Sequence, residues 1–133
     1  MSKRRSKQPD LLLGPMPVAQ INKTIGTELD PGEVVLSRAA QAHAARRHPA
    51  DYPTLLPHLD EIVADPMYIG DDHKNSGIEL VGRPVGTRAW MLIAVTLEKD
   101  KHGRYNVVSF YPVSEGKIQS RRERGFLKIA QKA

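Results

Sequence analysis

The chain has 133 residues, a net charge of +5 and no cysteine. This length suits one domain with its own hydrophobic core, which we expect at residues 16–133. Without cysteine there can be no disulfide, thiolate nucleophile or zinc–thiolate site. Apolar runs such as residues 11–13 are too short for a membrane span or for the core of a secretory signal. We therefore expect a cytoplasmic protein that makes no membrane contact.

Charge is unevenly distributed along the sequence. Four basic residues and one acid occupy residues 1–10, and six basic residues and one acid occupy residues 116–133. Basic ends on a more acidic body suit contact with a polyanion, although charge runs are also common as solvated surface. Residues 1–15 combine this charge with Pro9, Gly14 and Pro15 and show no periodicity, which predicts a disordered basic arm.

The first two short elements are expected to form a β-hairpin. Residues 18–21 and 33–36 have the composition of strands, and the turn sequence of residues 30–32 lies between them. The pair Asp30 and Pro31 is also compatible with a helix start. The structure before residue 37 therefore has two interpretations, of which we favour the hairpin.

Two helices are expected next. The first runs from Ser37, a favourable N-cap, to His48, because Pro49 disfavours helical geometry in the residue before it. The second starts after Asp51, another favourable cap, and ends before Pro66. Its apolar residues recur at helical spacing and form a one-sided stripe: Leu55, Leu56, Leu59, Ile62 and Val63.

Beyond residue 66 the apolar pattern changes to a period of two, which predicts strands at residues 67–69, 78–82, 88–98 and 105–111. The polar segment 99–103 joins the last two strands as a hairpin turn. Ser114 is a favourable cap for a basic C-terminal helix that ends near Arg124. Helices followed by strands indicate an α+β fold with a mostly antiparallel sheet.

The first helix carries the residues with the clearest potential for chemistry. On a helical wheel His43 lies within about 60° of Arg46 and Arg47, so the three side chains can converge on one site. His48 lies about 140° from His43 and joins them only if the helix frays before Pro49. Histidine exchanges protons near neutral pH, and arginine stabilises a phosphate. Each also has a structural interpretation: a core histidine, a charge at the helix C-terminus, and surface arginines.

The last strand adds hydroxyl groups. Ser109 and Tyr111 are expected to share one sheet face with Tyr105, and Arg88 and Thr96 of the neighbouring strand are expected to share it too. Such hydroxyl groups can hydrogen-bond a phosphate, and the rings can stack on a base. The same face can equally be an ordinary solvated surface.

Other motifs give little support to a metal or cofactor. Residues 71–73 hold two carboxylates and a histidine, but adjacent loop residues rarely converge on one ion without partners elsewhere. The sequence also lacks the HExxH helix, the Walker loop and the Gly-x-Ser-x-Gly elbow. No cofactor is expected. Lys74, Arg121 and Arg122 are expected to bind substrate instead.

Taken in order, several of these features resemble one family. They are the helix with His43 to His48 followed by proline, the Leu-rich helix ending at Asp65, and the strand that closes at residues 108–112. This set resembles the phage-encoded barnase/EndoU/colicin/RelE-like (BECR fold) nuclease domains, over residues 17–131. The resemblance implies two helices on a four-stranded antiparallel sheet, to which the sequence adds the N-terminal hairpin and the basic C-terminal helix. It also implies metal-independent cleavage of RNA.

The resemblance suggests roles for individual residues. His43 would accept the proton of the ribose 2′-hydroxyl, and Arg46 or Arg47 would stabilise the charged phosphorane. His48 or Tyr111 would protonate the departing 5′-oxygen, and Ser109 would position the phosphate. The last strands lack the histidine that barnase-like members carry in addition to a catalytic glutamate.

The expected activity is therefore endoribonuclease cleavage of tRNA or mRNA in a bacterial host. An immunity protein or a phage structural protein is a further expected partner. The alternative is a phage accessory domain that keeps this fold and binds nucleic acid or a protein without catalysis. A third possibility, metal-dependent DNA cleavage, would require residues 71–73 as the metal site.

Overall fold

The computed structural model describes residues 9–72, 77–84, 86 and 89–132. The strands are β1 (Leu11–Pro15), β2 (Glu33–Leu36), β3 (Tyr68–Asp72), β4 (Gly77–Gly82), β5 (Trp90–Thr96), β6 (Arg104–Val113) and β7 (Leu127–Ile129). The helices are α1 (Val18–Ile25), α2 (Arg38–Arg47), α3 (Tyr52–Leu55), α4 (Leu59–Ala64) and α5 (Glu115–Glu123), with a 3₁₀ turn, η1 (Leu56–His58), between α3 and α4.

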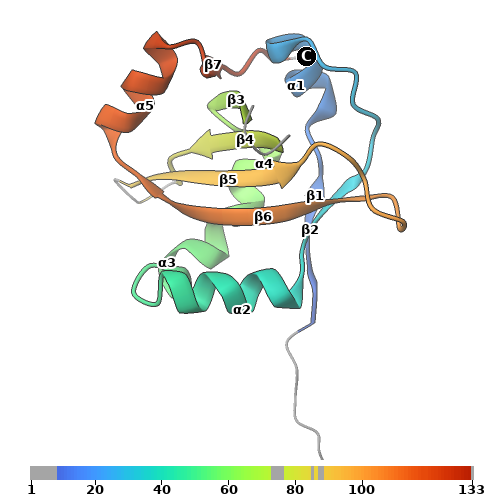
Figure 1. Cartoon of the computed structure of the whole chain (residues 1–133), viewed down its shortest axis with the longest axis vertical. Helices are drawn as coiled ribbons and strands as arrows, with labels where there is room; N and C mark the ends of the chain where they lie inside the picture. The colour runs from blue at the N-terminus through green and yellow to red at the C-terminus, as the bar shows by residue number, and fades with distance from the viewer. Residues whose placement is uncertain (1–8, 73–76, 85, 87–88, 133) are drawn as a thin grey trace, which may run out of the picture.

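One mixed sheet of seven strands organises the chain, in the order β1-β2-β6-β5-β4-β3-β7. β2 and β6 are parallel, and the other neighbouring pairs are antiparallel. Figure 1 shows α2 beside β6, and α5 with β7 at the other side of the sheet. The expected fold of two helices on a four-stranded antiparallel sheet is therefore wrong, because three further strands join the sheet and one pairing is parallel.

The N-terminal part of the chain differs most from the sequence prediction. Residues 18–21 begin helix α1 and are not a strand, so the predicted hairpin is wrong. Val18, Ile21 and Ile25 recur at helical spacing and pack in the main core. Gly26 ends the helix in the left-handed conformation, with φ of 74°. Residues 11–15, predicted to belong to the disordered arm, form β1 and pair with β2.

The second predicted helix is interrupted. α3 ends at Leu55, a 3₁₀ turn follows, and α4 begins at Leu59. Pro57 lies in this turn, where its ring and missing N–H oppose a continuous α-helix. Asp51 precedes α3, but its side chain makes no capping hydrogen bond. By contrast, Ser37 accepts a hydrogen bond from the Ala40 N–H at 3.1 Å, which confirms the predicted cap of α2.

Apolar side chains cover both faces of the sheet. The larger cluster lies under α1, α2 and α4 and includes Ile21, Ala44, Leu59, Ile93 and Phe110. The smaller cluster lies under α5 and β7 and consists of Val81, Trp90, Leu92, Ile118 and Leu127. Since both faces are covered, strands β4 and β5 are buried along most of their length.

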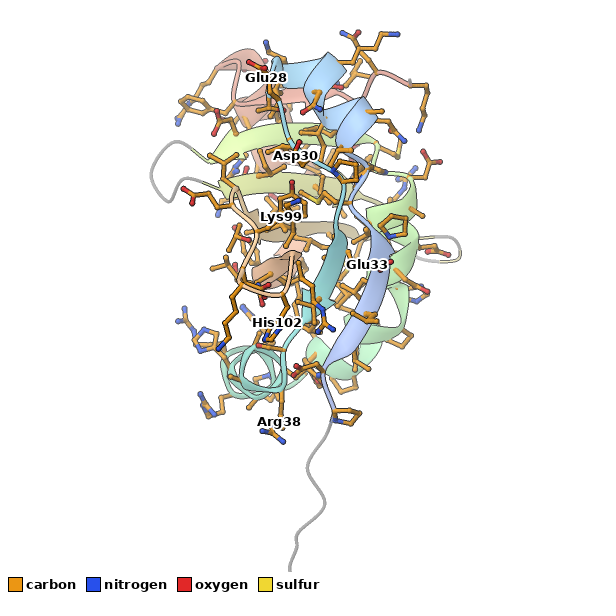
Figure 2. The ribbon with its side chains drawn as sticks, turned by 90° about the vertical axis from the view of Figure 1, so that its right-hand side faces the viewer. Glu28, Asp30, Glu33, Arg38, Lys99 and His102 are labelled. Carbon is orange, nitrogen blue, oxygen red and sulfur yellow. The ribbon has the colours of Figure 1, made fainter. Side chains whose placement is uncertain are left out.

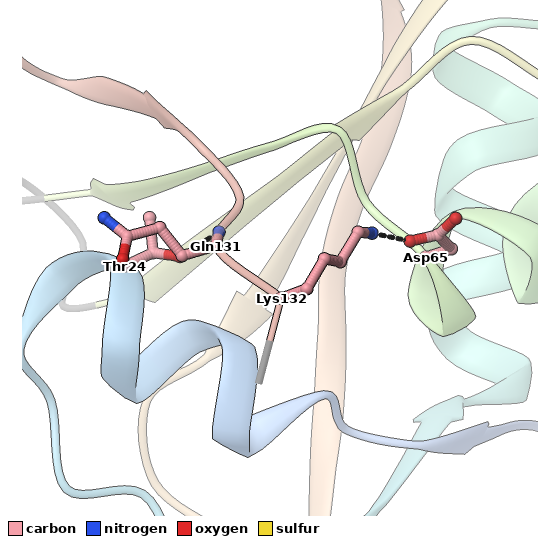
Figure 3. A network of polar contacts seen from close by, with 4 residues as sticks. All are labelled: Thr24, Asp65, Gln131 and Lys132. Carbon is pink, nitrogen blue, oxygen red and sulfur yellow. Dashed lines mark hydrogen bonds and ion pairs between the residues drawn. The ribbon is translucent and has the colours of Figure 1, made fainter.

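The C-terminal segment makes polar contacts with α1 and with the residue that follows α4 (Figure 3). The Gln131 N–H donates to the Thr24 hydroxyl at 2.8 Å, and the Lys132 ammonium pairs with the Asp65 carboxylate. The Ala130 N–H donates to the Met67 carbonyl at 2.9 Å. These contacts hold β7 against β3 at the edge of the sheet. No helix in the described part of the chain is both long and apolar enough to cross a membrane.

Candidate active site

A cavity of about 210 Å³ lies between helix α2 and strand β6. We call it the α2–β6 cavity, and its lining residues are Ala40, His43, Ala44, Arg47, His48, Ser109, Phe110 and Tyr111. Five of the six residues predicted to be catalytic therefore come together in it. Phe110 belongs to the buried core and packs against Tyr52, with ring centroids 5.9 Å apart.

One face of α2 forms a wall of the cavity. Ala40, His43, Ala44 and Arg47 follow the i, i+3, i+4, i+7 spacing of a single helical stripe. Ala44 is buried against the core, whereas His43 and Arg47 are exposed at the rim. His43 is thus not a core histidine. Arg46 is also exposed but does not line the cavity, so the predicted convergence of all three side chains holds for His43 and Arg47 only.

His48 reaches the cavity because α2 stops before it. The residue has φ of −135° and ψ of 60°, outside the helical region, as expected next to Pro49. Its backbone N–H still donates to the Ala44 carbonyl at 2.8 Å, so the residue caps the helix. The imidazole stacks on the ring of Tyr111, with centroids 6.2 Å apart and planes inclined by 25°. His48 is therefore held between the end of α2 and strand β6.

A β-bulge decides which β6 side chains face which way. The pairing register with β5 shifts between Ala94 and Val95, so Ser109 pairs with Ala94 and Val107 with Val95. Val108 is the additional residue, and its side chain is exposed. Tyr105 consequently lies in the core and not on the face of Ser109 and Tyr111, which corrects the predicted alternation.

Three of the predicted substrate-binding residues, Thr96, Arg121 and Arg122, do not line this cavity. The Thr96 hydroxyl donates to the Glu98 carbonyl and accepts from the Asn106 N–H, each at 3.0 Å, which supports the β5–β6 hairpin. Arg121 pairs with Glu79, and Arg122 packs on Tyr68, both on the α5 side of the sheet. Lys74 and Arg88 lie outside the described residues.

Glu79 is a polar residue that the sequence interpretation missed. It lies on β4 between two core residues, is buried, and pairs with Arg121 of α5. Cross-strand pairing places it in line with Ala94 and Ser109 on one sheet face. An acid between Ile78 and Leu80 in a strand, followed later by a basic helix, is the signal that could have indicated this pair.

Three exposed acidic residues, Glu28, Asp30 and Glu33, do not line the α2–β6 cavity. They are exposed on the side that Figure 2 shows, where they are spread from the top of the view to its middle, with Arg38 at the bottom. The α2–β6 cavity extends along α2 from Ala40 to His48, and the basic residues Arg46 and Arg47 form the last turn of this helix. A phosphate at the cavity therefore meets basic side chains from the helix.

Metal ligands are not gathered at this cavity. Within residues 9–72, 77–84, 86 and 89–132, no group of three histidine, aspartate, glutamate or cysteine side chains is placed to hold an ion. Asp71 and Asp72 end strand β3, and His73 lies outside the described residues. The residues of the α2–β6 cavity themselves supply two imidazoles, a guanidinium and two hydroxyl groups. That set supports acid–base chemistry on a phosphate ester.

A cavity that holds two imidazoles and a guanidinium beside a basic helix is compatible with cleavage of a phosphodiester. A comparison with family models gives the class directly. Residues 13–120 match the family described as phage-Barnase-EndoU-ColicinE5/D-RelE like nuclease3, so the chain belongs to this nuclease family. No match is found among curated proteins or among solved structures. The matched residues include both walls of the α2–β6 cavity.

Proposed function

We propose that the protein is a metal-independent endoribonuclease that cleaves RNA by transphosphorylation in the α2–β6 cavity. The observation that carries this proposal is the gathering of His43, Arg47, His48, Ser109 and Tyr111 around one cavity of about 210 Å³. Membership of a nuclease family supports the phosphodiester as the bond that is cleaved. The two histidines supply the proton acceptor and the proton donor that such a cleavage needs without a metal.

The reaction has one bond formed and one bond broken at phosphorus. Neutral His43 accepts the proton of the ribose 2′-hydroxyl, and the 2′-oxygen attacks the phosphorus. The bond to the 5′-oxygen breaks, and that oxygen takes a proton from the His48 imidazolium. The products are a 2′,3′-cyclic phosphate and a 5′-hydroxyl end. Arg47 stabilises the negative charge that develops on the phosphorane, and the Ser109 hydroxyl donates a hydrogen bond to a phosphate oxygen.

His48 is a better proton donor than Tyr111 for this step. An imidazolium releases its proton near neutral pH, whereas a phenol does so only in alkaline solution. The stacking of Tyr111 on His48 favours a positioning role for the tyrosine ring. His43, exposed at the rim, is accessible to the 2′-hydroxyl of a bound strand.

The proposal extends to where and on what the protein acts. We propose tRNA or mRNA as substrate, in the cytoplasm of the bacterial host of a phage or prophage. Binding through the basic N-terminal residues and basic C-terminal helix should weaken steeply with salt, because counterions are released from the RNA. An immunity protein or a phage structural protein is a proposed partner.

The test is cleavage of total RNA and tRNA by the purified protein in the presence of a chelator. We expect cyclic phosphate ends, and we expect His43→Ala and His48→Ala to lower the rate by about 10²–10⁴-fold each. His102→Ala is the matched control, because His102 is exposed on the β5–β6 hairpin and does not line the cavity. Binding of RNA without any cleavage would instead indicate a non-catalytic module, and activity restored only by a divalent metal would exclude the mechanism.

A second substrate distinguishes the two histidines. A nucleoside 3′-(p-nitrophenyl phosphate) has a leaving group that departs without a proton donor. We expect His48→Ala to retain most of the wild-type rate on this substrate, and His43→Ala to remain impaired. The reverse pattern would exchange the two roles, and equal losses would contradict the assignment of a proton donor.

A further inference from the structure

A second and larger cavity lies on the α5 side of the sheet. Its volume is about 610 Å³, and its lining residues include Tyr68, Trp90, Ile118, Arg122, Leu127 and Lys128. We call it the α5–β3 groove. It shares no lining residue with the α2–β6 cavity. A cavity of this volume is large enough for a small organic group, since ligand sites commonly measure about 300–1,000 Å³.

Aromatic rings and guanidinium groups are layered in the groove. The rings of Tyr68 and Trp90 meet with centroids 5.6 Å apart and planes inclined by 47°. The Arg122 guanidinium lies 5.0 Å from the centre of the Tyr68 ring and donates to its hydroxyl at 3.4 Å. Outside the lining residues, the Arg83 guanidinium lies 5.1 Å from the centre of the Trp90 ring. Aromatic rings and guanidinium planes are the groups on which proteins stack unpaired nucleobases.

The charges that line the groove favour a base over a phosphate. Arg122 and Lys128 are basic, but Glu115 and Glu123 of α5 line the same groove. These charges balance, so the groove does not attract a polyanion by net charge. Carboxylate and amide groups, by contrast, hydrogen-bond the edges of bases, and Gln119 adds an amide.

The groove and the α2–β6 cavity are connected by the sheet. Tyr68, Val81, Leu92 and Tyr111 are successive cross-strand partners on β3, β4, β5 and β6. Three steps between neighbouring strands span about 14 Å. All four residues pack in or against the same apolar cluster, so they share one face. Val81 and Leu92 are buried between the two places, so a single strand of RNA that occupies both must pass over the outer surface of the molecule.

We propose that the α5–β3 groove binds a nucleobase of the single-stranded RNA whose phosphate occupies the α2–β6 cavity. This inference rests on the proposed function and adds to it a base-binding subsite remote from the cleaved bond. The base stacks on the exposed Arg122 guanidinium, which the Tyr68 ring supports from its other side. Part of the groove, including Arg122, Leu127 and Lys128, lies beyond the residues that match the family model.

The chain carries its own probe for this test. Trp90 is the single tryptophan, and it lines the groove. We would titrate the full-length protein with a short RNA made uncleavable by 2′-O-methylation and follow Trp90 fluorescence. A series of otherwise identical strands, each abasic at one position, is titrated in the same way. We expect the intact strand to change the fluorescence, and we expect no change with the strand that is abasic at the position that enters the groove.

Matched variants identify the binding residues. We expect Tyr68→Leu and Arg122→Gln to weaken binding by about tenfold, as loss of a stacking partner does, and Tyr68→Phe to restore it. Arg124→Gln removes the same charge from a residue that does not line the groove, and it should bind like wild type. Equal weakening by Arg122→Gln and Arg124→Gln, or equal binding by every abasic strand, would overturn the proposal.

The readout separates this proposal from the proposed function. Binding of the uncleavable strand is measured without any catalytic step. The base-binding subsite can therefore be tested even if the protein does not cut RNA. If cleavage is found but Tyr68→Leu raises neither the Kd of the uncleavable strand nor the KM of a cleavable one, the subsite is refuted and the nuclease assignment stands. Circular dichroism of Tyr68→Leu and Tyr68→Phe verifies that both variants fold.

Discussion

The imidazole of His48 stacks on the ring of Tyr111, with centroids 6.2 Å apart. His48 follows the last residue of α2, and Tyr111 belongs to β6. The contact fixes the end of α2 on the sheet at the place where His43 and Arg47 line the cavity. It thus couples the geometry of the proposed proton donor to a residue far away in the sequence.

Two substitutions at Tyr111 distinguish the contribution of its ring from that of its hydroxyl group. Tyr111→Phe keeps the ring that stacks on His48, so we expect most of the cleavage rate to remain. Tyr111→Leu removes the stacking partner and should lower kcat by about tenfold or more, since misplacing a catalytic group by about 1 Å can cost 10²-fold. Single-turnover rates on a fluorescent RNA measure both effects. A loss as large in Tyr111→Phe as in His48→Ala would make the hydroxyl itself the proton donor.

The β5–β6 hairpin should make stability depend on acid pH. Asp100 accepts hydrogen bonds from the Asn106 side chain at 2.8 Å and from the backbone N–H groups of Arg104 and His102. The Asn106 side chain first, and then these N–H groups, hold the pKa of Asp100 below its ordinary value of 3.8. A lowered pKa means that the charged carboxylate stabilises the fold above the unfolded-state value and that this contribution disappears as the pH falls through the lowered value.

The variant Asp100→Asn lacks this charge at every pH. We therefore expect its Tm to lie below that of the wild type at neutral pH, and the difference to shrink as the pH falls below 3.8 and through the lowered pKa of Asp100. Thermal unfolding followed by circular dichroism across this range measures the difference. A gap that stays constant with pH would show that the charge of Asp100 does not contribute.

Gly70 permits the close approach of β7 to β3. A Cβ atom at this position would overlap the Phe126 carbonyl and lie 3.0 Å from a Leu127 methyl group. We expect Gly70→Ala to lower the free energy of unfolding by about 1–3 kcal/mol, as overpacking does. Gly116→Ala is the control, because nothing lies near its Cβ position and alanine is the better helix former by about 1 kcal/mol. Urea unfolding should show opposite signs for the two variants.

The Glu79–Arg121 ion pair should stabilise the fold, and the effect of replacing one partner should depend on whether the other is present. Glu79 is buried, so Arg121→Gln leaves its carboxylate without this partner and should destabilise the fold by on the order of 3 kcal/mol. Glu79→Gln removes the buried charge and should cost less. In a double-mutant cycle we expect the combined variant to lose less than the sum of the single losses. Additive losses would indicate that the two side chains act independently.

The sequence predicted best where a local signal decides the structure. Ser37 and Ser114 cap α2 and α5 as expected, and Pro49 ends α2 so that His48 leaves the helix. The strands at β3 to β6 follow the alternation of apolar residues. The helical wheel was sufficient to bring His43 and Arg47 together, because both lie on one helical stripe.

Other features depend on partners distant in the sequence. β7 is three residues long with Ile129 exposed, so it is a strand only because β3 pairs with it. The bulge at Val108 has no signature in a run of alternating residues, and it reversed the expected face of Tyr105. Arg121 and Arg122 were predicted to bind substrate, and their contacts with Glu79 and Tyr68 depend on the fold and could not be predicted from the sequence.

The parallel pairing of β2 with β6 has a consequence for how the protein is made. During synthesis β1, α1, β2 and α2 leave the ribosome long before β6, and non-local pairings of this kind form late in folding. A nascent chain that ends before Ser109 carries His43 without the strand that faces it. The complete set of cavity residues therefore exists only after β6 has been synthesised, and chains that stop before it are expected to lack the proposed activity.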